Sequence, residues 1–165
     1  MIEKQTLFTR GEGGYHTYRI PAILTAKTGT LLAVCEGRRD SGSDTGNIDL
    51  LLRRSEDQGT TWSEAIEITA STKQSEWTWY ATGPGAGLAI ERGPHKGRRN
   101  MTLRASFDEA ETWPVALVLH SGLAAYSDLA VAPDGTICCL YECGAEERYS
   151  EQIVLARIQP EALGI

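Results

Sequence analysis

The sequence contains no apolar run long enough to cross a membrane, since none reaches the roughly 18 consecutive apolar residues expected of a spanning helix. It also lacks the apolar segment of a signal peptide, because residues 1–5 lead directly into the mixed pattern of a folded domain. As written, we expect a cytoplasmic product with no membrane partner.

Basic residues are outnumbered in this chain. Its 16 lysines and arginines face 22 aspartates and glutamates, which gives a formal net charge of -6. A protein that binds the phosphate backbone of nucleic acid needs a basic face, so we expect no nucleic-acid partner. An anionic small ligand is not excluded, because a local arginine cluster can oppose the overall sign.

Cysteine is scarce, with Cys35, Cys138, Cys139 and Cys143 the four in the sequence. All sit within or beside apolar runs, and Cys138 and Cys139 would point to opposite faces if their run is a strand. We interpret them as reduced core thiols. Two alternatives stay open: a zinc site from Cys139, Cys143 and a histidine, which lacks a second ligand pair, and one disulfide in an exported homologue.

Short apolar runs separated by turn signals dominate the chain, and helical periodicity is confined to a short stretch near the C-terminus. This pattern predicts an all-β protein with hairpin turns at 28–29, 57–59 and 133–135. The predicted strands are residues 5–9, 19–26, 31–36, 48–54, 64–69, 79–82, 87–90, 101–106, 115–120, 128–132, 137–141 and 152–157.

Residues 55–62 and 106–113 share the frame S-x-D-x-(G/A)-x-T-W. Repetition of a four-strand unit with its turn fixed in sequence is typical of a propeller. The frame resembles the Asp box of sialidase-type β-propellers, a structural turn. Its Asp should accept backbone hydrogen bonds, its Gly should take a positive φ, and its Trp should pack the turn onto the blade. Ala110 replaces the Gly in the second copy, so we expect a strained or reshaped turn there.

Residues 18–22, Tyr-Arg-Ile-Pro-Ala, resemble the motif that opens the sialidase domain. The resemblance implies that Arg19 belongs to an arginine triad that grips the carboxylate of the sugar. A guanidinium suits this task because its fork meets a carboxylate bidentately and keeps its charge. A second triad arginine is implied just before Met101, where Arg98 fits by its offset and Arg99 is the alternative.

Residues 35–49 resemble the next segment of the family, a strand end followed by a loop that bears the acid/base aspartate. Asp44 is the best match because it stands just before Gly-Asn-Ile-Asp, and Asp40 is the fallback. A loop aspartate can move onto the glycosidic oxygen. Glu36 and Arg38 match positions that line the same pocket, so we expect them to bind substrate.

Residues 125–129 and 139–142 resemble the last blade of sialidases, where the first segment holds the nucleophile Tyr126 and the second ends in Glu142, which orients Arg19. A strand, a turn and a second strand between them place both at one hairpin mouth. Sialidases depart from the usual two-carboxylate scheme, and a neutral phenol avoids repulsion by the substrate carboxylate. An unaided phenol has a pKa of about 10 and attacks poorly at neutral pH.

The resemblance covers most residues from 7 to 157 but skips the middle of the domain. At about 40 to 45 residues per blade, the chain suffices for about three blades, an incomplete propeller of four-stranded antiparallel sheets. We expect one domain over 1–165: a first blade at 1–75, a composite blade at 76–120 and a last blade at 121–165. Two copies could close a six-bladed ring as a homodimer.

Two functions of the family fall in the missing middle: the glutamate that deprotonates the tyrosine, and the remaining triad arginine. Glu146, Glu147 and Glu151 lie in the last blade, and nothing in the sequence places them beside Tyr126.

The resemblance implies an exo-α-sialidase-like glycoside hydrolase that cleaves terminal sialic acid with retention of configuration. Arg19 and Arg98 would hold the carboxylate, and Asp44 would protonate the leaving oxygen. Tyr126 would form the glycosyl intermediate, with Glu142 orienting Arg19. The partner would be a sialylated glycan or free sialic acid, with no metal or organic cofactor. The alternative is a catalytically dead remnant that binds acidic sugars or assists assembly, and a truncated family member would be secreted or periplasmic.

Overall fold

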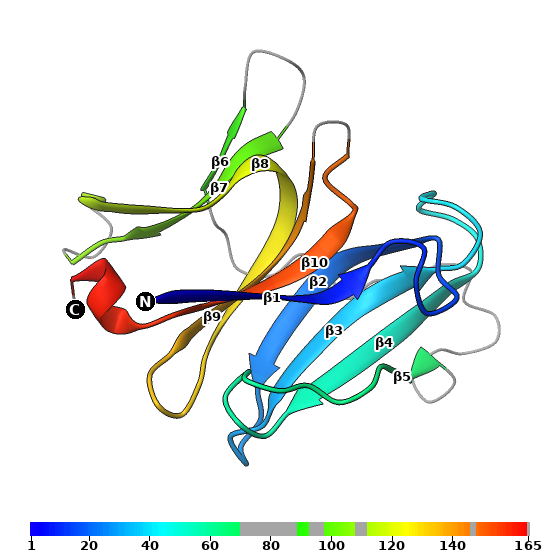
Figure 1. Ribbon diagram of the computed structural model, residues 1–165, viewed down its shortest axis with the longest axis horizontal. Helices are drawn as coiled ribbons and strands as arrows, with labels where there is room; N and C mark the ends of the chain where they lie inside the picture. The colour runs from blue at the N-terminus through cyan, green and yellow to red at the C-terminus, as the bar shows by residue number, and fades with distance from the viewer. Residues whose placement is uncertain (70–88, 93–97, 108–111, 146–147, 165) are drawn as a thin grey trace.

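The computed structural model describes residues 1–69, 89–92, 98–107, 112–145 and 148–164, and it is built almost entirely from antiparallel strands (Figure 1). They are β1 (Ile2–Thr9), β2 (Thr17–Thr25), β3 (Leu31–Arg38), β4 (Ile48–Ser55), β5 (Ile66–Glu67), β6 (Ala89–Arg92), β7 (Arg98–Ala105), β8 (Val115–Val131), β9 (Ile137–Gly144) and β10 (Gln152–Ile158). A short 3-10 helix, η1 (Pro160–Leu163), follows. The all-β prediction is confirmed, while the strand expected at 79–82 lies outside the described residues.

The first blade is a sheet of four strands in the order β2-β3-β4-β5. The predicted turn at 28–29 joins β2 to β3, with Gly29 at φ 87° and its N–H bonded to the carbonyl of Ala26 at 2.9 Å. The register of β2 against β3 shifts between Arg19 and Ala22. This irregularity interrupts the sheet where the Arg19 side chain leaves the strand.

The second sheet runs β1-β10-β9-β8-β7-β6, and its six strands form two units that share β8. The first half of β8 pairs with β7 up to Leu123, and the second half pairs with β9 from Leu123 to Val131. The strands predicted at 115–120 and 128–132 are therefore one continuous strand. The segment from Ser121 to Ser127 contains no proline to end it, and register shifts let it bend from one partner to the other.

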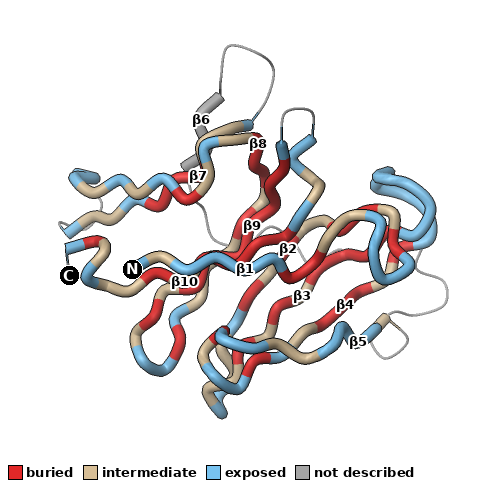
Figure 2. Tube along the Cα trace, in the orientation of Figure 1, coloured by how far each residue is buried: buried red, intermediate tan, exposed pale blue. Residues whose placement is uncertain are grey.

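The unit β1-β10-β9-β8 lies in the middle of the molecule, and its strands β9 and β10 are buried on both faces, whereas most of β1 is exposed (Figure 2). Leu140 and Ile153 point into a core shared with the first blade, and Tyr141 and Val154 point into a core shared with β7 and β8. The N-terminal strand β1 completes this unit by pairing with β10. Three layers thus form an arc of blades, the incomplete propeller predicted from length. The blade boundaries at 75 and 120 stay a prediction.

The first Asp box has the predicted geometry. Asp57 accepts hydrogen bonds from the backbone N–H and the hydroxyl of Thr61, at 2.8 and 2.6 Å. Gly59 takes φ 86°, and Trp62 packs against the first core. In the second copy, residues 108–111 lie outside the described part of the chain, and Trp113 is exposed. The first turn therefore secures its blade through contacts that the second tryptophan does not reproduce.

All four cysteines are buried free thiols, as predicted. Cys138 belongs to the first core and Cys139 to the second, so the pair does point to opposite faces. Burial raises the pKa of Cys138 and of Cys143 to about 11. Among the described residues, no three His, Cys, Asp or Glu side chains gather as a metal site. No helix in the described ranges has the length and apolar character needed to span a membrane.

Candidate functional site

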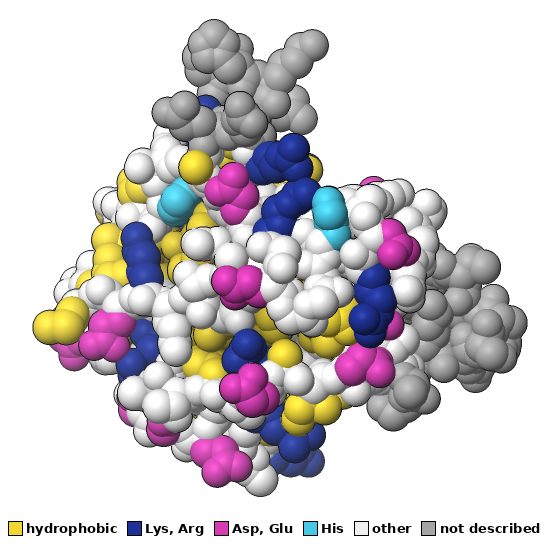
Figure 3. Space-filling view, turned by 45° about the vertical axis from the view of Figure 1, so that its right-hand side comes forward, with side chains coloured by type: hydrophobic (Ala, Val, Ile, Leu, Met, Phe, Trp, Pro, Cys, Tyr) yellow, Lys and Arg dark blue, Asp and Glu magenta, His cyan; other side chains and the backbone are white. Residues whose placement is uncertain are grey.

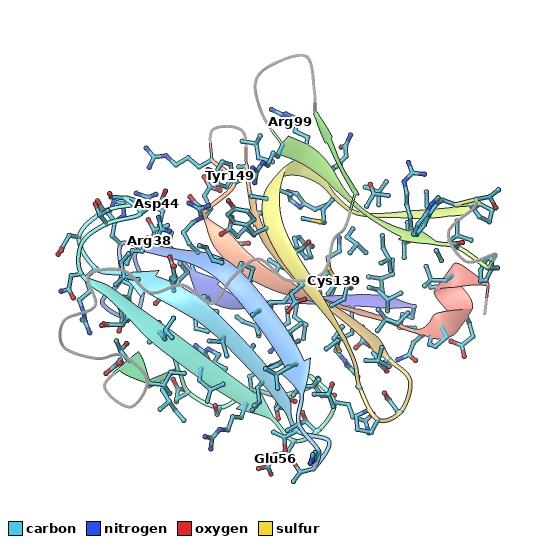
Figure 4. The ribbon with its side chains drawn as sticks, turned by 180° about the vertical axis from the view of Figure 1, so that it is seen from behind. Arg38, Asp44, Glu56, Arg99, Cys139 and Tyr149 are labelled. Atoms are coloured by element: carbon cyan, nitrogen blue, oxygen red, sulfur yellow. The ribbon has the colours of Figure 1, made fainter. Side chains whose placement is uncertain are left out.

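A pocket of about 590 Å³ opens at one end of the sheets, between the first blade and the central unit. Figure 4 shows Arg38, Asp44 and Tyr149 at this end, whereas Glu56 of the Asp-box turn lies at the opposite end. The lining residues are Arg19, Ile20, Asp44, Thr45, Tyr126 and Tyr149. Three of the seven predicted site residues therefore line one pocket, although they come from distant parts of the chain.

The floor of the pocket is an ion pair between β2 and β9. Oε1 of Glu142 accepts hydrogen bonds from Nε of Arg19 and from the backbone N–H of Ile20, each at 2.8 Å. Ile20 stands at φ 51°, the left-handed region, inside the irregular stretch of β2. A β-branched residue avoids this region, so the carboxylate offsets local backbone strain as well as pairing with the arginine.

Burial and ion pairing shift the pKa of each partner in this ion pair in opposite directions. Loss of hydration raises the pKa of Glu142, and the charge of Arg19 and the N–H of Ile20 offset part of that rise. For Arg19, burial lowers the pKa, but the charge and hydrogen bond of Glu142 outweigh it, so the pKa of Arg19 is raised overall. Arg19 therefore keeps its positive charge although its side chain is only 12% exposed.

Tyr126 lies where β8 loses its register with β9, between Ala124 and Ser127. Its ring is contacted by two guanidinium groups: Cζ of Arg19 lies 5.5 Å and Cζ of Arg98 lies 5.2 Å from the ring centroid. Such contacts are favourable because the cations face the negative π-system. The structure thus brings the predicted nucleophile and the two predicted carboxylate-binding arginines together from β8, β2 and β7.

Asp44 projects from the loop between β3 and β4 and is 80% exposed, but a buried arginine holds it. Nη1 of Arg38 lies 2.8 Å from Oδ1 of Asp44 and donates to the carbonyl of Gly42 at 2.6 Å. Nε and Nη2 of the same arginine bond Glu36 at 3.0 and 2.7 Å. Burial raises the pKa of Glu36, and Arg38 opposes that rise. In this geometry Glu36 and Arg38 anchor the Asp44 loop, and their predicted contact with substrate stays a prediction.

Tyr149 was missed by sequence reasoning. It lies in the connection between β9 and β10, is 37% exposed, and its ring centroid lies 5.2 Å from Cζ of Arg19. No motif marks it, since it stands seven positions after Glu142 in a polar segment. Its position in the chain could have indicated it, because the loop that follows Glu142 must lie near the same pocket as Glu142.

Several predicted candidates lie away from the pocket. Arg99 pairs through its backbone with Leu123 of β8, and Arg98, not Arg99, contacts Tyr126. Asp40 does not line the pocket. Glu151 closes its own loop, because its carboxylate accepts the backbone N–H of Ala145 at 2.8 Å. Residues 146–147 lie outside the described part of the chain.

Arg19, which lines the pocket, and Arg98, which contacts the ring of Tyr126, form a local positive cluster on a mixed surface. On the face shown in Figure 3, blue basic and magenta acidic side chains are interspersed. The chain as a whole carries a net charge of -6. A small anion would therefore be attracted to the pocket by Arg19 and Arg98 rather than by the overall charge.

Comparisons with known proteins show which family and which proteins this chain resembles. The profile of the BNR repeat-like domain matches residues 21–139. An exo-alpha-sialidase of Aspergillus fumigatus is 22% identical over 211 residues, covering 75% of this chain and 51% of that protein. An exo-alpha-sialidase of Arthroderma benhamiae is 28% identical over 132 residues, covering 61% and 32%. A sialidase of Micromonospora viridifaciens is 45% identical over 53 residues, covering 32% and 8%.

Among solved structures, the Hadza microbial sialidase Hz136 is 18% identical with a TM-score of 0.40, covering 84% of this chain and 35% of that one. The intramolecular trans-sialidase from Ruminococcus gnavus, solved with oseltamivir carboxylate, is 18% identical with a TM-score of 0.32, covering 93% and 34%. The chain spans about half the length of the Aspergillus relative, and less of the others.

Proposed function

This chain belongs to the BNR repeat-like, sialidase-type family, and on that premise we propose that it is an exo-α-sialidase-like glycoside hydrolase. Its substrate would be a glycoconjugate that ends in sialic acid, and its products free sialic acid and the shortened glycan. The observation that carries the proposal is the contact of both Arg19 and Arg98 with the ring of Tyr126.

Recognition of the sugar would begin at its carboxylate. Nε of Arg19 is held by Glu142, so the two terminal nitrogens are the donors that remain for a ligand. Arg98 is exposed beside the same phenol ring, which supports a role for it as a second cation that binds the carboxylate. Charge-assisted hydrogen bonds to a carboxylate contribute about 1.5–3 kcal/mol each. Arginine suits this role because its planar fork donates in parallel.

In the covalent step, one bond to the anomeric carbon would form while another breaks. The hydroxyl oxygen of Tyr126 attacks that carbon, the bond to the glycosidic oxygen breaks, and Asp44 transfers a proton to the departing oxygen. The phenolic proton passes to water in the open pocket. In the second step Asp44 accepts a proton from the water that attacks the same carbon, sialic acid is released, and Tyr126 regains its proton from solvent. Two displacements retain the configuration.

A second function, acidic-sugar binding without hydrolysis, is favoured by a specific feature of the site. Among the described residues, no carboxylate hydrogen-bonds the hydroxyl of Tyr126, so the phenol has no general base there. The arginine contacts would be retained in such a binding module. Affinity for the carboxylate would then persist although the chemical step is slow.

Release of a fluorogenic phenol from an aryl α-sialoside tests the proposal. The wild-type protein should release it at a steady rate that is lost in Tyr126→Phe, a variant that keeps the ring contacted by both arginines. Calorimetric titration with free sialic acid should give the same affinity for both proteins. Binding without turnover would favour the second function, and neither binding nor turnover would contradict both.

A further inference from the structure

Arg19 is contacted by a second tyrosine that the proposed mechanism does not use. Its Cζ lies 5.2 Å from the ring centroid of Tyr149 and 5.5 Å from that of Tyr126, while Glu142 holds its Nε. We propose that Tyr149 is a positioning residue for carboxylate recognition, whose ring fixes the guanidinium of Arg19 so that its terminal nitrogens face the ligand. This inference rests on the proposed function.

The contact suits that role because it restrains the arginine without using its donors. An aromatic ring attracts a guanidinium through its π-face, which leaves the in-plane N–H groups free for a carboxylate. Among the described side chains, none accepts a hydrogen bond from either terminal nitrogen of Arg19. Without Tyr149, the guanidinium could rotate about the Nε that Glu142 holds, and the fork would have to be ordered again at each binding event.

The described residues on either side of Tyr149 contact the end of β9 and the residue that follows β1. Glu151 accepts the backbone N–H of Ala145 with its carboxylate and the N–H of Arg10 with its carbonyl, both at 2.8 Å. Gly144 has no room for a side chain, since an added Cβ would overlap the carbonyl oxygen of Arg148. The backbone at Arg148 and at Glu151 is thus restrained by Gly144, Ala145 and Arg10, which limits the positions open to the Tyr149 ring.

The first test is independent of any ligand. In nuclear magnetic resonance spectra, the δ-methylene and ε-proton signals of Arg19 should be displaced by the ring currents of both tyrosines. Tyr149→Ala should lose part of that displacement and Tyr149→Phe should keep it. The signals of Arg39, whose Cζ lies 4.7 Å from the ring centroid of Tyr15, serve as an internal reference for correct folding. Unchanged Arg19 signals in Tyr149→Ala would overturn the inference.

The second test measures recognition by calorimetry with free sialic acid and with its methyl ester. Tyr149→Ala should weaken binding of the free acid about fivefold to thirtyfold, the loss expected for a cation–π contact. Tyr149→Phe should restore it, and the neutral ester should bind all three proteins alike. Equal weakening of acid and ester, or none, would overturn the positioning role. If the wild type binds no sialic acid, the proposed function fails, while the Arg19 signals still decide whether Tyr149 positions the arginine.

Discussion

Glu142 is fully buried, and its Oε1 lies 2.8 Å from Nε of Arg19, which lines the pocket. The same oxygen accepts the backbone N–H of Ile20, so one carboxylate joins the strand β9 of the central unit to the irregular stretch of β2. A single buried group therefore positions the cation and supports the strained backbone beside it.

Glu142→Gln should lower the free energy of unfolding by about 2–3 kcal/mol, less than the 3–5 kcal/mol typical of a fully buried pair, because Arg19 still reaches the pocket. Urea denaturation would measure the change. Glu3→Gln, which breaks the surface pair with Arg157, should cost less than about 1 kcal/mol and serves as the control. A loss for Glu142→Gln no larger than that of the control would contradict the structural role.

Asp57 should make stability depend on pH. Hydrogen bonds from the hydroxyl and then the backbone N–H of Thr61 lower its pKa from 3.8 to about 2. A carboxyl whose folded pKa is lowered contributes stability above its unfolded pKa, and that contribution is lost as the pH falls toward about 2. Asp57→Asn should therefore be less stable than wild type at pH 6. In urea titrations, the difference in free energy of unfolding between the two proteins should narrow from pH 4 downward. Glu56→Gln, on the same exposed turn, is the control and should show no such pH-dependent difference in the free energy of unfolding from wild type.

Much of the site could be predicted because its residues stand in motifs. Arg19, Asp44, Tyr126 and Glu142 were each recognised from a short segment, and the structure brings them to one end of the sheets. The alternation of Cys138 and Cys139 followed from strand periodicity alone. Both inferences use local sequence, which is where motifs and periodicity carry information.

The remaining features depend on contacts between distant segments. The anchoring of Asp44 by Arg38 required the path of the loop between β3 and β4. Tyr149 has no sequence pattern, and only the closing of the β9–β10 loop brings its ring to Arg19. The continuity of β8 was missed because small residues look like a strand break when the partner strands on either side are unknown.

Gly59→Ala should destabilise the first blade by about 1–2 kcal/mol, since a side chain at φ 86° is strained. An added Cβ there would also meet Cδ2 of Leu155 at 3.2 Å, in the core between two layers. Thermal denaturation would measure the loss. Gly42→Ala is the matched control, because its nearest contact would be Oγ1 of Thr17 at 3.8 Å. Equal melting temperatures for the two variants would contradict the role assigned to the turn.

Ring closure by two copies predicts a dimer in light scattering. Val118 is 54% exposed and points away from the core face that holds Leu119, so an apolar side chain is available on the outer blade. Val118→Glu should shift the mass to that of a monomer, because a charge would be buried in the interface. Val131→Glu is the control: it lies at a 58% exposed position near the 133–135 hairpin turn, and it should leave the mass of the dimer unchanged. A monomeric wild type would contradict ring closure.

The central claim is that Tyr126 is the nucleophile, and covalent trapping tests it most directly. A sialyl fluoride that bears a second fluorine beside the anomeric carbon slows breakdown of the intermediate by destabilising the oxocarbenium-like transition state. Intact mass spectrometry after incubation should show one added fluorosialyl group, and peptide mapping should locate it on Tyr126, with no adduct in Tyr126→Phe. An unmodified wild-type protein, or an adduct on another residue, would contradict the account.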